Sequence, residues 1–118
     1  MTLNLVAFLF LGAGCLLVAI SLPLIYRKIP MNYFYGIRMR ASFQSDRDWY
    51  DINEYGGRVL AWWAVPIIIV GIAGFSFPPQ RLDQYVIIAA AVSVGSMVVA
   101  LIQTFRWVRR RKNSILSS

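Results

Sequence analysis

The chain has 118 residues, of which 58% are hydrophobic and only 14% are charged, with a net charge of +7. This composition is too apolar and too poor in charge for an ordinary soluble domain. It leaves no water-facing core of useful size, so we predict one small polytopic membrane domain over residues 1–118 with membrane lipids around it.

Three windows without any charged residue predict transmembrane helices. They are Leu3 to Tyr26, Val59 to Phe77 and Tyr85 to Phe105. About 20 apolar residues cross the roughly 30 Å hydrocarbon layer, so each window is long enough to span it. In the first window, Gly12 and Cys15 are interpreted as small packing residues. In the second, Pro66 predicts a local kink, and Gly71 and Gly74 are expected to soften the helix.

The third window carries small residues at four-residue spacing. The pairs are Ala89/Ser93, Ala91/Gly95 and Ser96/Ala100. This spacing lets helix backbones approach closely in lipid, either within the bundle or in a homo-oligomer. Both arrangements use the same residues, so the sequence leaves the oligomeric state open.

The placement of basic residues predicts how the chain lies in the membrane. The segment between the first two windows contains Arg27, Lys28, Arg38, Arg40, Arg47 and Arg58. The segment after the third window contains Arg106, Arg109, Arg110, Arg111 and Lys112. Between the second and third windows Arg81 is the single basic residue. Because Lys and Arg favour the cytoplasmic side, we expect the N-terminus outside and the first loop and C-terminus in the cytoplasm.

The loop at residues 27–58 is long for an unstructured connector in a compact protein. Ser45 is a favourable N-cap, and Asp48 completes a capping-box pattern. We therefore expect a helix from about Asp46 that either continues into the second span or breaks at Gly56–Gly57. The predicted fold is an all-α membrane protein: three transmembrane helices with a structured, partly helical cytoplasmic loop between helices 1 and 2.

The sequence lacks the residues that several common functions of membrane proteins and enzymes require. The windows contain no ionisable side chain for coupled transport, and a chain with no His and one Cys favours neither a zinc site nor a Cys/His nucleophile. Asp46, Asp48, Asp51 and Glu54 scatter around a helix and are interpreted as capping and ion-pairing groups. The basic tail is interpreted as an anchor at anionic headgroups rather than a nucleic-acid site. We thus predict no enzyme activity, no cofactor, no metal and no nucleic acid.

Asn53 is the most unusual residue of the loop. It lies on a predicted helix face that otherwise consists of Trp, Ile and Gly, so it needs hydrogen-bond partners once buried. We predict that it bonds to the segment from Asn32 to Arg38, and that Arg38 pairs with a carboxylate, first of all Asp46. This cap over the helix ends either only joins the first two spans or also forms a binding surface, with Tyr35 expected to be exposed.

The same stretch resembles the SdpI family of small bacterial membrane proteins. The matching motif consists of Asn32, Gly36, Ile37, Arg38, Ser45, Asp46, Trp49, Asn53 and Gly57. Tyr35 joins these as a candidate binding residue. The resemblance is strong from about Pro30 to Trp63, and Met39 stands where the family often has a Thr. The family's named member is a larger immunity protein that protects a sporulating bacterium from its own killing peptide and captures a transcriptional repressor at the membrane.

The resemblance implies protection against a membrane-active antimicrobial peptide, by binding the toxin or a toxin-sensitive partner, with a role in signalling. One alternative is a small accessory or signalling subunit that docks a cytoplasmic protein on the basic loop and tail. A further alternative is a small dimeric transporter.

Overall fold

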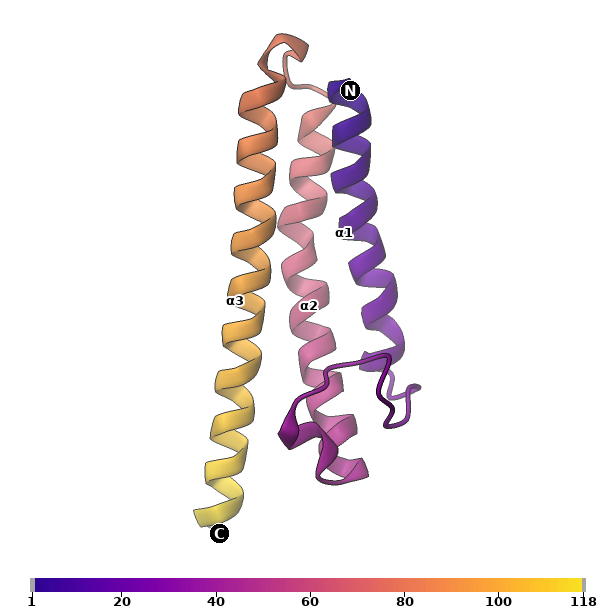
Figure 1. The fold of residues 1–118 in the computed structure, drawn as a ribbon, viewed down its shortest axis with the longest axis vertical. Helices are drawn as coiled ribbons and strands as arrows, with labels where there is room; N and C mark the ends of the chain where they lie inside the picture. Colours follow the sequence, from indigo (N-terminus) through magenta and orange to yellow (C-terminus); the bar gives the residue numbers. More distant parts are fainter. Residues whose placement is uncertain (1, 118) are drawn as a thin grey trace.

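The described part of the chain contains three long α-helices and two short 3-10 turns. The computed structural model describes residues 2–117 and has no strand within that range (Figure 1). The elements are α1 (Leu3–Ile25), η1 (Arg40–Phe43), α2 (Asp46–Gly74), η2 (Pro79–Arg81) and α3 (Leu82–Ser117). All three α-helices are long and apolar enough to cross a membrane. The prediction of an all-α, multi-pass membrane protein is confirmed.

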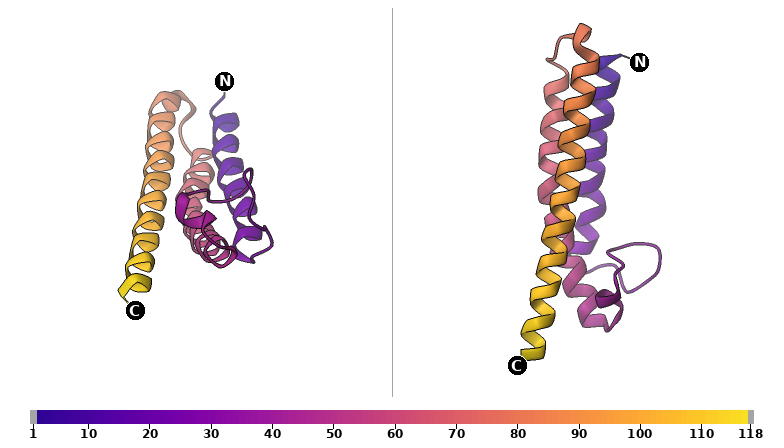
Figure 2. Two further views of the ribbon diagram at one scale, coloured as in Figure 1. Left: turned by 60° about the horizontal axis from the view of Figure 1, so that its bottom comes forward. Right: turned by 60° about the vertical axis from the view of Figure 1, so that its left-hand side comes forward.

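Helix α2 is the centre of an elongated bundle. Figure 1 shows α2 between α1 and α3, all three running along a long axis of 58 Å. Figure 2 shows the segment after α1 folded against the N-terminal part of α2. At the opposite end, Phe10 of α1 meets Tyr85 of α3 edge to face, with ring centroids 6.2 Å apart. The first loop and the C-terminus of α3 therefore lie at one end of the bundle, and the N-terminus and η2 lie at the other.

Glycines bring α1 and α2 into close contact. A Cβ atom added at Gly14 would lie 2.6 Å from Cγ1 of Ile68, and one at Gly71 would lie 2.5 Å from the backbone nitrogen of Leu11. Because no Cβ fits at these positions, the two helices approach almost backbone to backbone. Gly71 is therefore a packing position. The sequence predicted only that it softens the helix.

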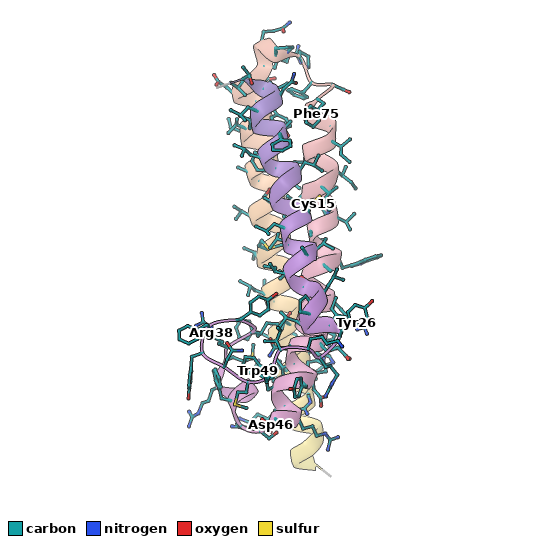
Figure 3. The ribbon with its side chains drawn as sticks, turned by 90° about the vertical axis from the view of Figure 1, so that its right-hand side faces the viewer. Cys15, Tyr26, Arg38, Asp46, Trp49 and Phe75 are labelled. Carbon is teal, nitrogen blue, oxygen red and sulfur yellow. The ribbon has the colours of Figure 1, made fainter. Side chains whose placement is uncertain are left out.

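Several small residues that were predicted to pack instead face outward. A Cβ added at Gly12 or Gly95 would meet nothing within 4 Å. Cys15 is exposed on α1 (Figure 3). Gly12 and Cys15 therefore do not pack against the other helices of the same chain, and only contact with lipid or a second copy of the chain remains for them. On α3, Ala89 and Ala100 are buried, so only part of the small-residue pattern faces the bundle.

Helix α2 begins at a side-chain cap and continues without a break into the membrane span. The Oγ atom of Ser45 accepts a hydrogen bond of 3.0 Å from the backbone N–H of Asp48, as the capping pattern predicted. The helix then passes through Gly56 and Gly57 as regular α-helix. Of the two predicted courses, the continuous one is confirmed. The connection between α1 and α2 is correspondingly shorter than predicted, and it runs from Tyr26 to Ser45.

The close approach at Gly71 predicts that Gly71→Ala and Gly95→Ala change the stability of the protein in opposite directions. In a helix, replacing Gly by Ala ordinarily stabilises by up to about 1 kcal/mol. Gly95→Ala should follow this rule, because its Cβ enters open space. Gly71→Ala should instead destabilise by about 1–3 kcal/mol, because its Cβ meets the backbone of Leu11. Thermal unfolding in detergent measures both, and a melting temperature that rises equally in the two variants would contradict this packing.

Candidate functional site

The side chain of Asn32 folds the first loop into a compact turn. Its Oδ1 atom accepts hydrogen bonds from the backbone N–H groups of Phe34, at 2.8 Å, and Tyr35, at 2.6 Å. Its Nδ2 atom donates to the carbonyl oxygens of Pro30, at 2.8 Å, and Tyr35, at 3.1 Å. The carboxamide has two donors and one acceptor oxygen with two lone pairs, so its capacity is fully used. Asn32 thus fixes the backbone of residues 30–35.

Two side chains of α2 hold this loop against the helix. Trp49 is completely buried, and its indole Nε1 donates to the carbonyl oxygen of Ile29 at 2.8 Å. One turn later, Oδ1 of Asn53 accepts from the backbone N–H of Ile37 at 2.5 Å. Its Nδ2 donates to the carbonyl of Trp49 at 2.9 Å and, more weakly, to that of Ile37 at 3.4 Å. The prediction that Asn53 bonds to the segment between Asn32 and Arg38 is confirmed.

Two glycines of the motif leave room for these contacts. Gly36 has a φ of +122°, which side-chain-bearing residues rarely adopt. A Cβ atom there would also lie 2.7 Å from Oδ1 of Asn53. Gly57 faces α1, where a Cβ would lie 3.2 Å from the carbonyl oxygen of Ser21. We call the assembly of residues 29–38 on the N-terminal turns of α2 the cap.

Three predicted site residues have surroundings that the sequence did not reveal. Arg38 is exposed and donates to the carbonyl oxygen of Tyr33. Within the described part of the chain, neither Arg38 nor Asp46 takes part in an ion pair, and the two lie apart (Figure 3). The predicted pair of Arg38 with Asp46 is therefore wrong. Tyr35 is half-buried, and its hydroxyl donates to the carbonyl of Ile20, so its predicted exposure is also wrong.

The large apolar side chains that the cap exposes are Tyr33 and Phe34. Their exposed fractions are 74% and 92%. The ring of Tyr33 stacks on Phe43 with centroids 5.4 Å apart, and Phe43 in turn contacts the buried ring of Trp49 at 5.5 Å. The prediction instead named Tyr35 as the exposed aromatic residue of this run. Asn32 turns the chain so that the first two aromatics point outward and the third points toward α1.

An ion-pair cluster joins the cap end of all three helices, and it confirms the predicted ion-pairing role of Asp48, Asp51 and Glu54. Arg111 of α3 donates to the carboxylates of Asp48 and Asp51 on α2, the latter at 2.8 Å. Arg27, just after α1, donates to Asp51 at 3.1 Å and lies 3.8 Å from Glu54. The side chain of Arg111 is only 18% exposed. The basic tail, which was predicted to be an anchor at anionic headgroups, therefore has one basic residue turned inward.

The sequence contains a pattern from which the inward direction of Arg111 could have been predicted. Ala100, Thr104, Val108 and Arg111 follow one another at helical spacing, and the first three are buried. The face that packs inside the membrane therefore continues past the end of the apolar window. Stacking of Tyr55 on Trp107, with centroids 4.3 Å apart, fastens the same stretch of α3 to α2.

The charges of the cluster shift two pKa values. Burial disfavours the ionised form of Asp51, but hydrogen bonds from Arg111 and Arg27 outweigh it, so the pKa of Asp51 is lowered. Burial likewise opposes the charge of Arg111, but the hydrogen bonds to Asp48 and Asp51 raise its pKa above the usual value. Both groups are thus held in their charged forms at neutral pH.

A comparison with known protein families finds a match to this region of the chain. A family model described as the SdpI/YfhL protein family matches residues 28–104. The chain belongs to this family. The match covers the whole cap, all of α2 and the apolar part of α3, and it includes every residue of the SdpI-like motif. No curated protein and no solved structure gives a significant match.

The hydrogen bonds of Asn53 predict a clear stability difference. Asn53→Ala should destabilise by about 1–3 kcal/mol, because it leaves the partly buried backbone groups of Ile37 without their side-chain partner. Arg47→Ala is the control, since that side chain is 86% exposed and forms only a 3.8 Å pair within its own helix. Thermal unfolding in detergent compares them. Equal melting temperatures would show that Asn53 does not hold the cap.

The ion-pair cluster predicts a dependence on pH. The pKa of Asp51 is lower in the folded than in the unfolded chain, so its stabilising effect is present above about pH 4 and is lost as pH falls further. Arg111→Gln should lower the melting temperature at neutral pH and flatten this acid dependence. Arg110→Gln, which alters an exposed side chain, should change neither. An unchanged acid profile in Arg111→Gln would contradict the assignment.

Proposed function

We propose that this chain is an SdpI-type immunity protein that protects a bacterial cell from a membrane-active antimicrobial peptide. Membership of the SdpI/YfhL family supports this function, because the family's named member neutralises such a peptide. The observation that carries the proposal is the cap. The motif residues direct most of their polar groups to the loop itself, and they present Tyr33 and Phe34 on a fixed backbone at the end of the bundle.

This aromatic pair suits recognition of an amphipathic peptide. Aromatic side chains contribute large apolar contact areas, and they favour the boundary between water and membrane. Tyr33 is supported from below by Phe43, so little conformational freedom is lost when a partner binds it. In our proposal the peptide inserts across the bilayer and lays its apolar face against Tyr33 and Phe34 on the side of the membrane where the cap lies. The cap residues Asn32, Trp49 and Asn53 position the pair without contacting the peptide.

We further propose that the cap faces the cytoplasm in the inner membrane. The first loop, the N-terminal half of α2 and the C-terminal end of α3 lie at the same end of the bundle, and together they carry 11 of the 12 basic residues (Figure 1). The opposite end carries Arg81 beside Asp83. Because basic segments stay on the cytoplasmic side, this asymmetry supports an N-terminus outside and a C-terminus inside.

Thiol labelling tests this orientation. Gln44→Cys and Gln80→Cys, each in a Cys15→Ala background, place single cysteines at opposite ends of the bundle. An impermeant thiol reagent applied to intact cells should label the cysteine at position 80 and leave that at position 44 unlabelled until the cells are opened. The reverse pattern would invert the proposed topology.

A second candidate function, docking of a cytoplasmic protein, has one specific observation in its favour. Helix α3 extends beyond the apolar window and exposes Arg109, Arg110 and Lys112, while Arg111 turns inward. Between η1 and this extension lies a groove of about 560 Å³ with Arg40 and Lys112 in its wall. An acidic surface on a partner would complement this groove, as expected for an accessory or signalling subunit.

A survival assay separates the two candidates. Cells that produce the protein are challenged with a membrane-active killing peptide of the kind that the family's immunity member neutralises. Phe34→Ala should lower protection at least about tenfold while the protein stays abundant and folded, because the side chain makes little contact within the protein. The double variant Arg109→Gln/Arg110→Gln should protect like the parent.

The opposite outcomes decide against the proposal. Full protection by an abundant Phe34→Ala protein would remove the aromatic pair as the binding surface. Loss of protection only in the Arg109→Gln/Arg110→Gln protein would favour docking of a cytoplasmic partner on the α3 extension.

A further inference from the structure

A groove between α2 and α3 opens on the side of the cap. Its volume is about 380 Å³, and its wall is almost entirely apolar. Leu60 of α2 and Met97, Leu101 and Phe105 of α3 line its length, while Arg38 of the cap stands at one end. Leu101 and Phe105 are 59% and 54% exposed, so the groove is open along its side.

The groove crosses the boundary between headgroups and hydrocarbon. Its polar end lies beside Gly56 and Thr104, next to the ends of the uncharged windows, where Arg58 and Arg106 follow in the sequence. From Thr104 it reaches back along α3 to Met97, which is about 10 Å at 1.5 Å per residue. An apolar groove at this depth faces lipid rather than water, so an acyl chain can occupy it.

Arg38 supplies an unneutralised charge at the polar end. One guanidinium nitrogen donates to the carbonyl oxygen of Tyr33, which orients the side chain. No carboxylate pairs with it within the described part of the chain. A guanidinium has five N–H donors in a planar fork that matches two oxygens of a phosphate, so donors remain for a ligand.

We propose that this groove binds one anionic phospholipid. The phosphate lies at Arg38, and one acyl chain runs along Leu60, Leu101 and Met97 toward the membrane centre. The charge of Arg38 complements the headgroup, and the apolar wall complements the chain. The wall of the groove includes neither Tyr33 nor Phe34, so the proposal does not depend on the proposed immunity function.

Native mass spectrometry of the purified full chain in detergent tests the site, with phosphatidylglycerol as the added lipid. The parent protein should bind one molecule preferentially. Arg38→Gln should weaken this binding about tenfold, and because Arg38 is exposed the variant should fold normally. Arg58→Gln is the matched control, since Arg58 is also exposed but lies on another face of α2, beside Tyr55 and Trp62.

A second set of ligands distinguishes binding of the whole lipid from binding of its headgroup alone. Long-chain phosphatidylglycerol should bind more tightly than the dihexanoyl form, and glycerol phosphate should not compete. Equal affinity of the parent and Arg38→Gln would overturn the proposal, and so would an equal loss in Arg58→Gln, which indicates unspecific attraction to a basic surface. A dimer that excludes lipid would also overturn it, because a second copy of the chain would then fill the groove.

Discussion

The cap depends on the carboxamide of Asn53, which bonds to the backbone N–H and, more weakly, the carbonyl of Ile37. Ile37 lies in a loop, so no helix or sheet provides hydrogen-bond partners for its backbone groups. The side chain of Asn53 provides them instead. It also places the side chain of Ile37 on Gly56, where an added Cβ would overlap it, and next to Thr104 of α3. A single amide thus fixes the loop to α2 and presents the loop to α3.

At the cap end of the bundle, α3 is joined to α2 by ion pairs and aromatic stacking rather than by small residues. Within the spans, α1 approaches α2 through Gly14 and Gly71, as expected where lipid provides no hydrophobic drive for association. Beyond the spans, water is present, and Arg111 with its two carboxylates, together with the stacked rings of Tyr55 and Trp107, takes over. Lipid surrounds the spans and water surrounds the cap end of the bundle, and this difference explains why glycine contacts join α1 and α2 in the spans and ion pairs join α2 and α3 at the cap end.

The sequence predicted the spans, the Ser45 cap and the role of Asn53, because these follow from local patterns of charge, capping and polarity. It did not predict where Arg38 and Tyr35 would point, since Asn32 and Gly36 turn the loop in ways that no periodicity records. Nor did it predict that Arg111 turns inward, because a run of basic residues looks uniform until the helix is rotated against its neighbour. In the same way, Gly71 and Gly95 are indistinguishable in sequence, although only Gly71 is packed.

Amide hydrogen exchange at Ile37 tests most directly whether Asn53 holds the cap. The backbone N–H of Ile37 lies in a loop, and Oδ1 of Asn53 is its hydrogen-bond acceptor. In the parent protein this amide should exchange slowly. In Asn53→Ala it should exchange on the order of 10–100-fold faster, whereas Arg38→Gln should leave it protected. An Ile37 amide that exchanges at the rate of an unstructured peptide in the parent protein would contradict the account.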